Sequence, residues 1–149
     1  MIQKYLLTSG FIAVVIILII LISGCIQMQP QEEQERKQIS FETVSKGYYS
    51  GHDERKNYVI NSQNEWGELW NKTMSRHVPL PEVPAVNFSE NTIIAVYKGS
   101  HRTGGYSIEI TKIVENEQKI VVYIKETSPP SGAGVTMAFT QPYHIVKTE

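Results

Sequence analysis

An unbroken run of apolar residues, Phe11 to Ile22, lies near the N-terminus and cannot belong to the surface of a soluble fold. It follows a single basic residue, Lys4, and precedes the small residues Ser23 and Gly24. A basic start, an apolar centre and small residues before a break are typical of an export signal. Extended back to Tyr5, the segment would form a helix about 27 Å long, nearly enough to span a bilayer, so an uncleaved signal anchor stays open.

Cys25 is the one cysteine of the protein, and it directly follows these small residues. The sequence Ile22-Ser23-Gly24-Cys25 resembles a lipobox, the lipoprotein processing signal. The thiolate can be alkylated by a diacyl or dialkyl glyceryl group, and each buried methylene then contributes roughly 0.8 kcal/mol of anchoring. We predict that residues 1–24 are a signal peptide and that Cys25 is lipidated; the alternative is an uncleaved anchor. Both place the remaining residues outside, on the outer face of the cytoplasmic membrane.

Residues 25–38 are rich in Gln and Glu and show no apolar periodicity. Such a segment cannot bury enough surface to offset the entropy of ordering, so we predict a flexible tether. A flexible tether of about a dozen residues reaches roughly 20 Å, which would lift a domain clear of the lipid headgroups. The globular domain is then expected over residues 39–149.

Composition and motifs exclude several functions. The formal net charge is −1, whereas a nucleic-acid-binding protein is normally basic. A single cysteine cannot form an internal disulfide, and no Cys/His cluster predicts a zinc site. No G-x-S-x-G, H-E-x-x-H or P-loop motif occurs, so we predict no catalytic residue, no metal and no cofactor. The histidines are too far apart in sequence for local metal ligation and are interpreted as scattered surface residues: His52, His77, His101 and His144.

One amphipathic helix is predicted from Ser62 to about Arg76. Ser62 and Glu65 have the spacing of a capping box, which marks a helix start. Two tryptophans, Trp66 and Trp70, follow on one helical face and are expected to pack on a sheet. The prolines between His77 and Ala85 exclude a helix or a central strand from that stretch.

The rest of the domain is expected to be strands. The fully apolar centre of Thr92–Lys98 favours a strand covered on both faces, and four other segments alternate apolar and polar residues. Short connections favour antiparallel pairing, with a hairpin turn at residues 115–118. The predicted fold is α+β: a mainly antiparallel, twisted sheet or open barrel with one helix. The alternating segments lie near residues 39–43, 106–111, 120–124 and 135–139, and two further strands are expected at residues 58–60 and 143–147.

Two glycine-containing loops are the candidate interaction sites. Gly99–Tyr106 combines paired glycines with Arg102, whose guanidinium can bind a carboxylate or another anion. Ser128–Gly134 places two prolines before permissive glycines, which makes a shaped loop. Both loops can equally be tight connections. The candidate interaction residues are Arg102, Thr103, Gly104, Gly105, Tyr106, Pro129, Pro130, Gly132, Pro142 and Tyr143.

These loops carry a resemblance to a known family. Thr103–Ile108, then Pro129 with its glycine loop, then Gln141–Val146 occur in the order seen in the PrcB C-terminal-domain family, small exported proteins. The helix and the Asn87-Phe88-Ser89 segment extend the resemblance over roughly Phe41 to Lys147, although the family pattern often has an aspartate where this sequence has Asn87. The naming member binds and stabilises a protease. The resemblance therefore implies a non-catalytic accessory domain with a protein partner, such as an exported protease.

Three functions remain open. The first is a membrane-anchored, non-catalytic protein-interaction domain. The second is a lipoprotein that binds a sugar, a peptide or a metal in a pocket lined by several tyrosines: Tyr48, Tyr49, Tyr97, Tyr123 and Tyr143. The third is a small hydrolase, which needs a nucleophile within reach of a histidine, or a protease inhibitor that presents Pro129-Pro130.

Overall fold

The computed structural model describes residues 37–117 and 119–148. The predicted signal peptide, Cys25 and most of the predicted tether lie outside the described residues. Lys37 and Gln38, assigned to the tether from the sequence, instead begin the first strand, β1 (Lys37–Ile39). Within the described ranges, no helix is both long and apolar enough to cross a membrane.

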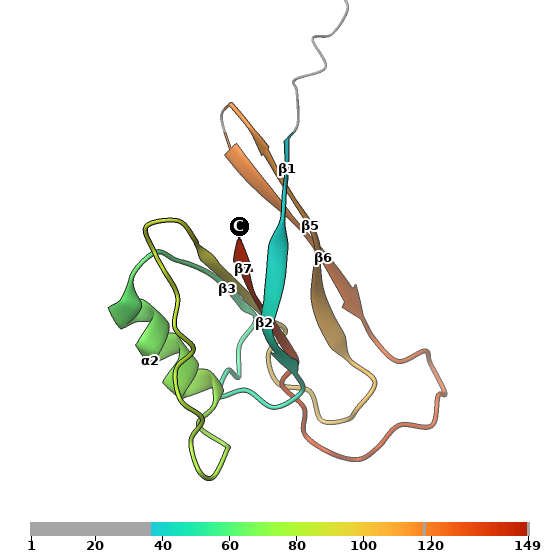
Figure 1. The fold of residues 1–149 in the computed structure, drawn as a ribbon. Helices are drawn as coiled ribbons and strands as arrows, with labels where there is room; N and C mark the ends of the chain where they lie inside the picture. Colours follow the sequence, from blue (N-terminus) through green and yellow to red (C-terminus); the bar gives the residue numbers. More distant parts are fainter. Residues whose placement is uncertain (1–36, 118, 149) are drawn as a thin grey trace, which may run out of the picture. The chain divides into compact units, whose positions relative to one another are not determined.

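Among the described residues, the strands form two antiparallel sheets, and one helix, α2 (Gln63–Thr73), packs beside them (Figure 1). This confirms the predicted α+β class, with two sheets in place of one. The first sheet has the strand order β1-β5-β6 and the second has the order β2-β7-β4-β3. The remaining strands are β2 (Phe41–Gly47), β3 (Lys56–Ile60), β4 (Ile93–Tyr97), β5 (Ser107–Asn116), β6 (Lys119–Thr127) and β7 (Tyr143–Thr148).

Strand β4 is buried along its whole length, as its apolar sequence predicts. It pairs with β3 on one side and with β7 on the other. Alternate residues serve two cores: Ile93, Ala95 and Tyr97 face the helix side, whereas Ile94 and Val96 face the β1-β5-β6 sheet. The helix, the four-stranded sheet and the three-stranded sheet therefore form three layers.

Helix α2 begins and is capped as the sequence predicts. The Ser62 hydroxyl accepts a hydrogen bond from the Glu65 amide at 3.4 Å and donates one to the Glu65 carboxylate at 2.7 Å. The helix ends at Thr73, three residues before the predicted Arg76. Trp66 and Trp70 are buried against the four-stranded sheet, which confirms that they are core residues.

The proline-rich segment after the helix folds back over the two tryptophans. The indole nitrogen of Trp66 donates to the Pro84 carbonyl at 2.8 Å, and that of Trp70 donates to the Pro81 carbonyl at 3.1 Å. Neither helix nor strand occurs between His77 and Ala85, as predicted. The segment thus satisfies both buried indole donors and closes the helix side of the core.

The three-stranded sheet is built on the predicted β5–β6 hairpin. Its inner face meets β4 and β7 through a second apolar cluster that includes Ile108, Ile110 and Ile113. The backbone passes from one sheet to the other between Ile39 of β1 and Phe41 of β2. β5 carries a bulge between Ile110 and Lys112, and this irregularity lies where β5 approaches β7.

The strand predicted over residues 135–139 is wrong. This stretch forms no ladder, and only a single bridge joins the neighbouring Thr140 to His101. Its alternating apolar side chains do not face a core: Met137 is 87% exposed and Phe139 is 68% exposed. Alternation predicts a strand only where one face is covered, and here no layer covers the segment.

Candidate functional site

Three connections meet at one end of the two sheets, which we call the loop end: residues 48–55, 98–106 and 128–142. They lie together at the bottom of Figure 1, opposite the tip of the β5–β6 hairpin. One carboxylate ties the first two connections to β6, because Glu126 forms ion pairs with both Arg55 and Lys98 at 2.8 Å. Sequence order alone does not reveal that the two candidate loops share this end with residues 48–55.

The two predicted glycine loops contact each other. Gly105 has a positive φ of 88°, and a Cβ at this position would lie 3.0 Å from the Pro129 side chain. The Gly104 amide donates to the Thr136 carbonyl at 2.9 Å, and His101 and Thr140 exchange two backbone hydrogen bonds. The Thr140 hydroxyl also donates to the Thr103 carbonyl at 2.9 Å. Residues 128–140 are therefore held in place although they form no strand.

The candidate interaction residues differ in exposure. Arg102, Gly105, Pro130 and Gly132 are exposed, and Thr103, Tyr106 and Pro129 are partly buried. Gly104, Pro142 and Tyr143 are buried and cannot present a contact surface. Tyr143 instead shares a hydrogen bond with Ser45 at 2.9 Å, and the Pro142 carbonyl accepts from the Lys98 amide at 2.9 Å.

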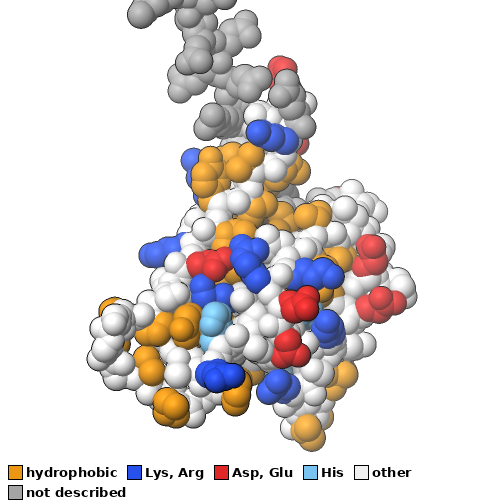
Figure 2. Space-filling model, turned by 180° about the vertical axis from the view of Figure 1, so that it is seen from behind, with side chains coloured by type: hydrophobic (Ala, Val, Ile, Leu, Met, Phe, Trp, Pro, Cys, Tyr) orange, Lys and Arg blue, Asp and Glu red, His pale blue; other side chains and the backbone are white. Residues whose placement is uncertain are grey.

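Four of the nine large apolar side chains that are exposed among the described residues lie at the loop end. Met137 and Phe139 project from residues 128–142, and Tyr48 and Tyr49 are each about half exposed on the neighbouring connection. The Gln141 amide donates to the Tyr48 carbonyl at 2.7 Å, which joins these two connections. From behind, apolar side chains gather on the side of the loop that follows β6, while charges of both signs are interspersed over the rest of that face (Figure 2).

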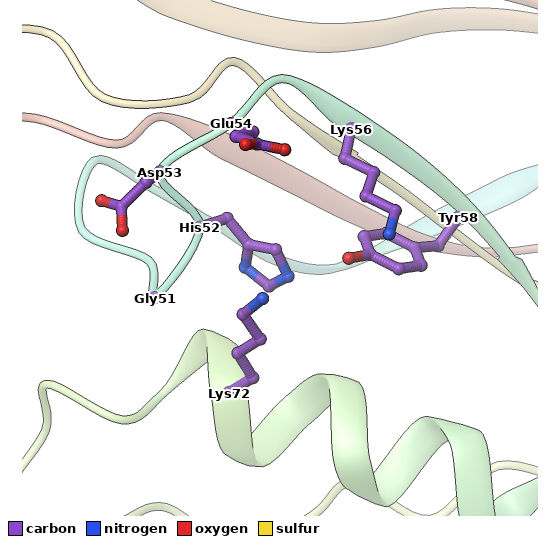
Figure 3. A pocket seen from close by; sticks show the side chains of 7 residues that line it. All are labelled: Gly51, His52, Asp53, Glu54, Lys56, Tyr58 and Lys72. Atoms are coloured by element: carbon purple, nitrogen blue, oxygen red, sulfur yellow. The ribbon is translucent and has the colours of Figure 1, made fainter.

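A small pocket of about 250 Å³ opens beside the same end of the molecule. Residues from the loop before β3, from β3 and from the last turn of α2 line it (Figure 3). The lining residues are Gly51, His52, Asp53, Glu54, Lys56, Tyr58 and Lys72.

His52 is the most unusual residue of the pocket. Its ring stacks on Tyr97 with centroids 3.7 Å apart and meets Tyr58 edge-on at 5.6 Å. The residue is only 3% exposed, and neither ring nitrogen has a hydrogen-bond partner. Burial lowers the pKa of His52 to about 4, and the nearby charges of Lys72 and Lys56 act in the same direction. The ring is therefore neutral at physiological pH.

The negative charge of Asp53 acts in the opposite direction and raises the pKa of His52. The carboxylate itself, however, is hydrogen-bonded to other residues. It accepts hydrogen bonds from the Ser100 hydroxyl at 2.8 Å and from the Gln141 amide group at 2.6 Å. These bonds, the Ser100 one first, lower the pKa of Asp53. In Figure 3 the Asp53 carboxylate points away from the His52 ring. The contact also fixes the pocket to the other two connections of the loop end.

Gly51 allows the loop to approach the end of α2 closely. A Cβ on Gly51 would lie 2.3 Å from the Lys72 carbonyl oxygen, a backbone atom that cannot rotate away. Only glycine fits this contact without a backbone shift. The close approach brings His52 and Lys72, which are far apart in sequence, to the same pocket.

A second buried histidine, His144, allows a test of the hydrolase hypothesis, which requires a nucleophile within reach of a histidine. Thr43 Oγ1 lies 2.9 Å from His144 Nε2, within reach for a nucleophile and a base. However, His144 Nδ1 accepts a hydrogen bond from the Ile110 amide at 2.9 Å. Nε2 must then carry the ring hydrogen and donate it to Thr43, so the ring cannot accept the threonine proton. His144 is also only 2% exposed, and this pair therefore has a structural role.

The histidine expectation needs correction. His52 and His144 are buried, not scattered surface residues, whereas His77 is exposed. Among the described residues, no three His, Cys, Asp or Glu side chains form a group that could hold a metal ion. The pocket described above is lined by Tyr58 and by none of the five tyrosines proposed from the sequence.

Sequence reasoning missed most of the pocket. It treated His52 as a scattered surface residue and attached no role to Lys56, Tyr58 or Lys72. The one available signal was Lys72, a basic residue near the end of the predicted helix, because a helix packed on a sheet ends at one end of that sheet. Nothing in the sequence pairs it with the loop that precedes β3.

The structure thus defines an α+β domain of two antiparallel sheets with exposed polar and apolar side chains at one end. Residues 92–149 match the family described as PrcB C-terminal, which confirms the resemblance for this segment. The matched segment includes β4 to β7 and both glycine loops, whereas α2 and the Asn87 segment precede it. No curated protein and no solved structure matches the sequence.

Proposed function

We propose that this protein is a non-catalytic accessory protein that binds an exported protein partner through its loop end. A lipid on Cys25, or an uncleaved signal anchor, holds it at the outer face of the cytoplasmic membrane. The leader sequence supports the location, and the PrcB C-terminal match supports association with a protease complex. An exported protease is therefore the proposed class of partner.

The proposal rests on the exposed apolar residues of the loop 128–142, which hydrogen bonds hold in place. Among the large apolar side chains described, only Val78 is more exposed than Met137, and Phe139 follows these two. Exposed apolar surface that is rimmed by polar groups is typical of protein-interaction sites. Because hydrogen bonds from Gly104 and His101 already hold the loop, little further ordering is needed on binding.

A photocrosslinking experiment in native membranes tests the proposal. A photoreactive phenylalanine analogue is placed at Phe139 of the full-length protein, and the crosslinked products are purified through a C-terminal tag and identified by mass spectrometry. The matched control carries the same analogue at Ile120, an apolar residue 55% exposed in β6 close to the opposite, hairpin end. We expect one stoichiometric exported protein with the Phe139 probe and none with the Ile120 probe. Equal capture by both probes, or capture by neither, would contradict the proposal.

The membrane location has its own test. A Cys25→Ser variant should be released from the membrane, or retain its leader, if Cys25 is lipidated. Intact mass spectrometry distinguishes the two products. A variant that stays on the membrane with an otherwise unchanged mass would favour the uncleaved anchor.

A further inference from the structure

We infer that the pocket around His52 binds a single carboxylate group of a polypeptide, either its C-terminal carboxylate or an Asp or Glu side chain. The inference deepens the proposed function, on which it rests for the polypeptide nature of the ligand. It rests on the cavity itself and on the donors that line it, Lys72, Lys56 and His52.

The first step concerns the unpaired ring of His52. A buried polar atom without a hydrogen-bond partner costs free energy, and native structures rarely retain one without a reason. His52 has two such nitrogens, both covered by neighbouring atoms in this structure, and its side chain lines the pocket. A neutral imidazole carries one N–H, so the ring offers a donor to a ligand that brings an acceptor oxygen.

The second step concerns charge. Figure 3 shows the Lys72 amino group next to the His52 ring and the Lys56 amino group beside Tyr58. The Lys56 nitrogen lies 5.0 Å from the centre of the Tyr58 ring. Two ammonium groups and one imidazole N–H suit an anion, since charge-assisted hydrogen bonds are the stronger ones.

The third step limits the anion to one negative charge. Asp53 and Glu54 also line the pocket, and the C-terminal turn of α2 directs the Lys72 carbonyl toward Gly51. Carboxylates and the C-terminus of a helix both disfavour a dianion such as phosphate. Arg76 lies close enough to act on Asp53 but not to line the pocket. The two lining carboxylates offset the two ammonium charges, so the pocket does not favour an anion with more than one negative charge.

The fourth step concerns size and position. Pockets for drug-sized ligands usually span about 300–1,000 Å³, and this one is smaller, at about 250 Å³. It can hold a terminal group or one short side chain but not a whole peptide. Asp53 connects the pocket to Ser100 and Gln141 of the loop end, so a protein bound there can reach it.

An NMR titration of the full-length protein in detergent micelles tests the inference. The ring nitrogens of His52 are observed while acetyl-Gly-Gly-Ala with a free carboxylate, its C-terminal amide, or acetyl-Gly-Asp-Gly amide is added at constant ionic strength. We expect one or both carboxylate peptides to shift the His52 signals and to raise its pKa, because a bound anion favours the imidazolium. The amide should have no effect. Which of the two carboxylate peptides binds identifies the source of the group.

Two lysine variants provide the matched comparison. Lys72→Gln removes an exposed pocket ammonium and should weaken carboxylate binding about tenfold, the usual effect of losing one charge-assisted hydrogen bond. Lys119→Gln changes an exposed lysine of β6 at the hairpin end and should bind like the wild type. Equal binding of the amide, unchanged affinity in Lys72→Gln, tighter binding of inorganic phosphate, or no His52 response would overturn the inference.

The crosslinking experiment separates this inference from the proposed function. A Lys72→Gln variant that captures its neighbour through Phe139 as well as the wild type does would refute the carboxylate site and leave the interaction function standing. A wild-type protein that captures no neighbour but binds the carboxylate peptides would do the reverse.

Discussion

The two buried histidines, His144 and His52, have nearly the same exposure and opposite surroundings. His144 lies between the sheets with both ring nitrogens hydrogen-bonded, to the Ile110 amide and to the Thr43 hydroxyl. His52 lies under an open pocket with neither nitrogen bonded. Burial lowers the pKa of both rings. A histidine thus joins two layers of the fold at position 144, whereas at position 52 its hydrogen-bond donor and acceptor have no partner.

This difference separates a structural histidine from a candidate recognition residue. Burying a polar group stabilises a fold only when its hydrogen bonds are replaced. His144 meets that condition and also satisfies the Ile110 amide beside the β5 bulge. His52 does not, so its ring contributes packing on Tyr97 while its nitrogens carry a desolvation cost. A ligand that supplies an acceptor would remove part of that cost.

The largest expected effect is that of His144→Phe. The variant leaves the Ile110 amide buried without an acceptor and forces a larger ring between the sheets, so we expect a loss of about 4 kcal/mol in the free energy of unfolding. Urea unfolding of the full-length protein in micelles, followed by the fluorescence of the buried Trp66 and Trp70, measures it.

Thr43→Val changes the same hydrogen-bond network and should reduce the free energy of unfolding by less. It removes only the hydrogen bond at His144 Nε2 and should cost about 1 kcal/mol. If His144→Phe is as stable as the wild type, the network between the sheets does not stabilise the fold and the contrast with His52 fails.

The second prediction concerns pH. In the folded protein the pKa of His52 is lowered from 6.5 to about 4, so the unfolded state binds a proton in this range while the folded state does not. Stability is therefore complete above about pH 7 and falls as the pH drops from 6.5 to 4, by roughly 3 kcal/mol for this ring. Unfolding in urea at a series of pH values measures the slope.

Other groups act differently in this window. The lowered pKa values of His144 and His101 add to the same fall in stability. The lowered pKa values of Asp53, Glu109 and Glu126 contribute stability that is lost only as the pH falls below their ordinary range. The histidines should thus dominate between pH 6.5 and 4.5, and a flat profile there would contradict the assigned protonation states.

His52→Phe should have the opposite sign to His144→Phe. Phenylalanine keeps the stacking on Tyr97 and removes the two unpaired nitrogens, so we expect a gain of about 1 kcal/mol at pH 7 and a shallower dependence on pH. The same variant should lose the proposed carboxylate binding. Destabilisation of the size expected for His144→Phe would show that His52 is a structural residue as well.

Much of the fold was predictable because its signals are local. The capping box, the tryptophan spacing and the apolar centre of β4 each report a burial pattern within a few residues. Residues 135–139 show where this fails, since alternation appears in the sequence although no layer covers the segment. The division into two sheets also escaped prediction, because it depends on the backbone passing between the sheets at Ser40, a position with no distinctive residue.

The pocket was not predictable for a related reason. His52 and Lys72 meet only because Gly51 packs against the last turn of α2, a contact between segments about twenty residues apart. The two glycine loops were found from composition, but the burial of Pro142 and Tyr143 follows from β7 starting at Tyr143, against β2 and β4. Local patterns indicate which residues are buried, whereas long-range packing decides which of them meet.

The smallest expected effect is a change in the pKa of His52 without any ligand. Lys72 has the larger influence of the two lysines, so Lys72→Gln should raise that pKa, and Lys56→Gln should raise it by less. Lys46→Gln should likewise raise the pKa of His144 and leave the pKa of His52 unchanged. The ring signals of both histidines, followed by NMR against pH in one sample, give all of these values. If Lys72→Gln shifts His144 as much as His52, the two rings do not occupy separate electrostatic environments, and the comparison that motivates the pocket would lose its basis.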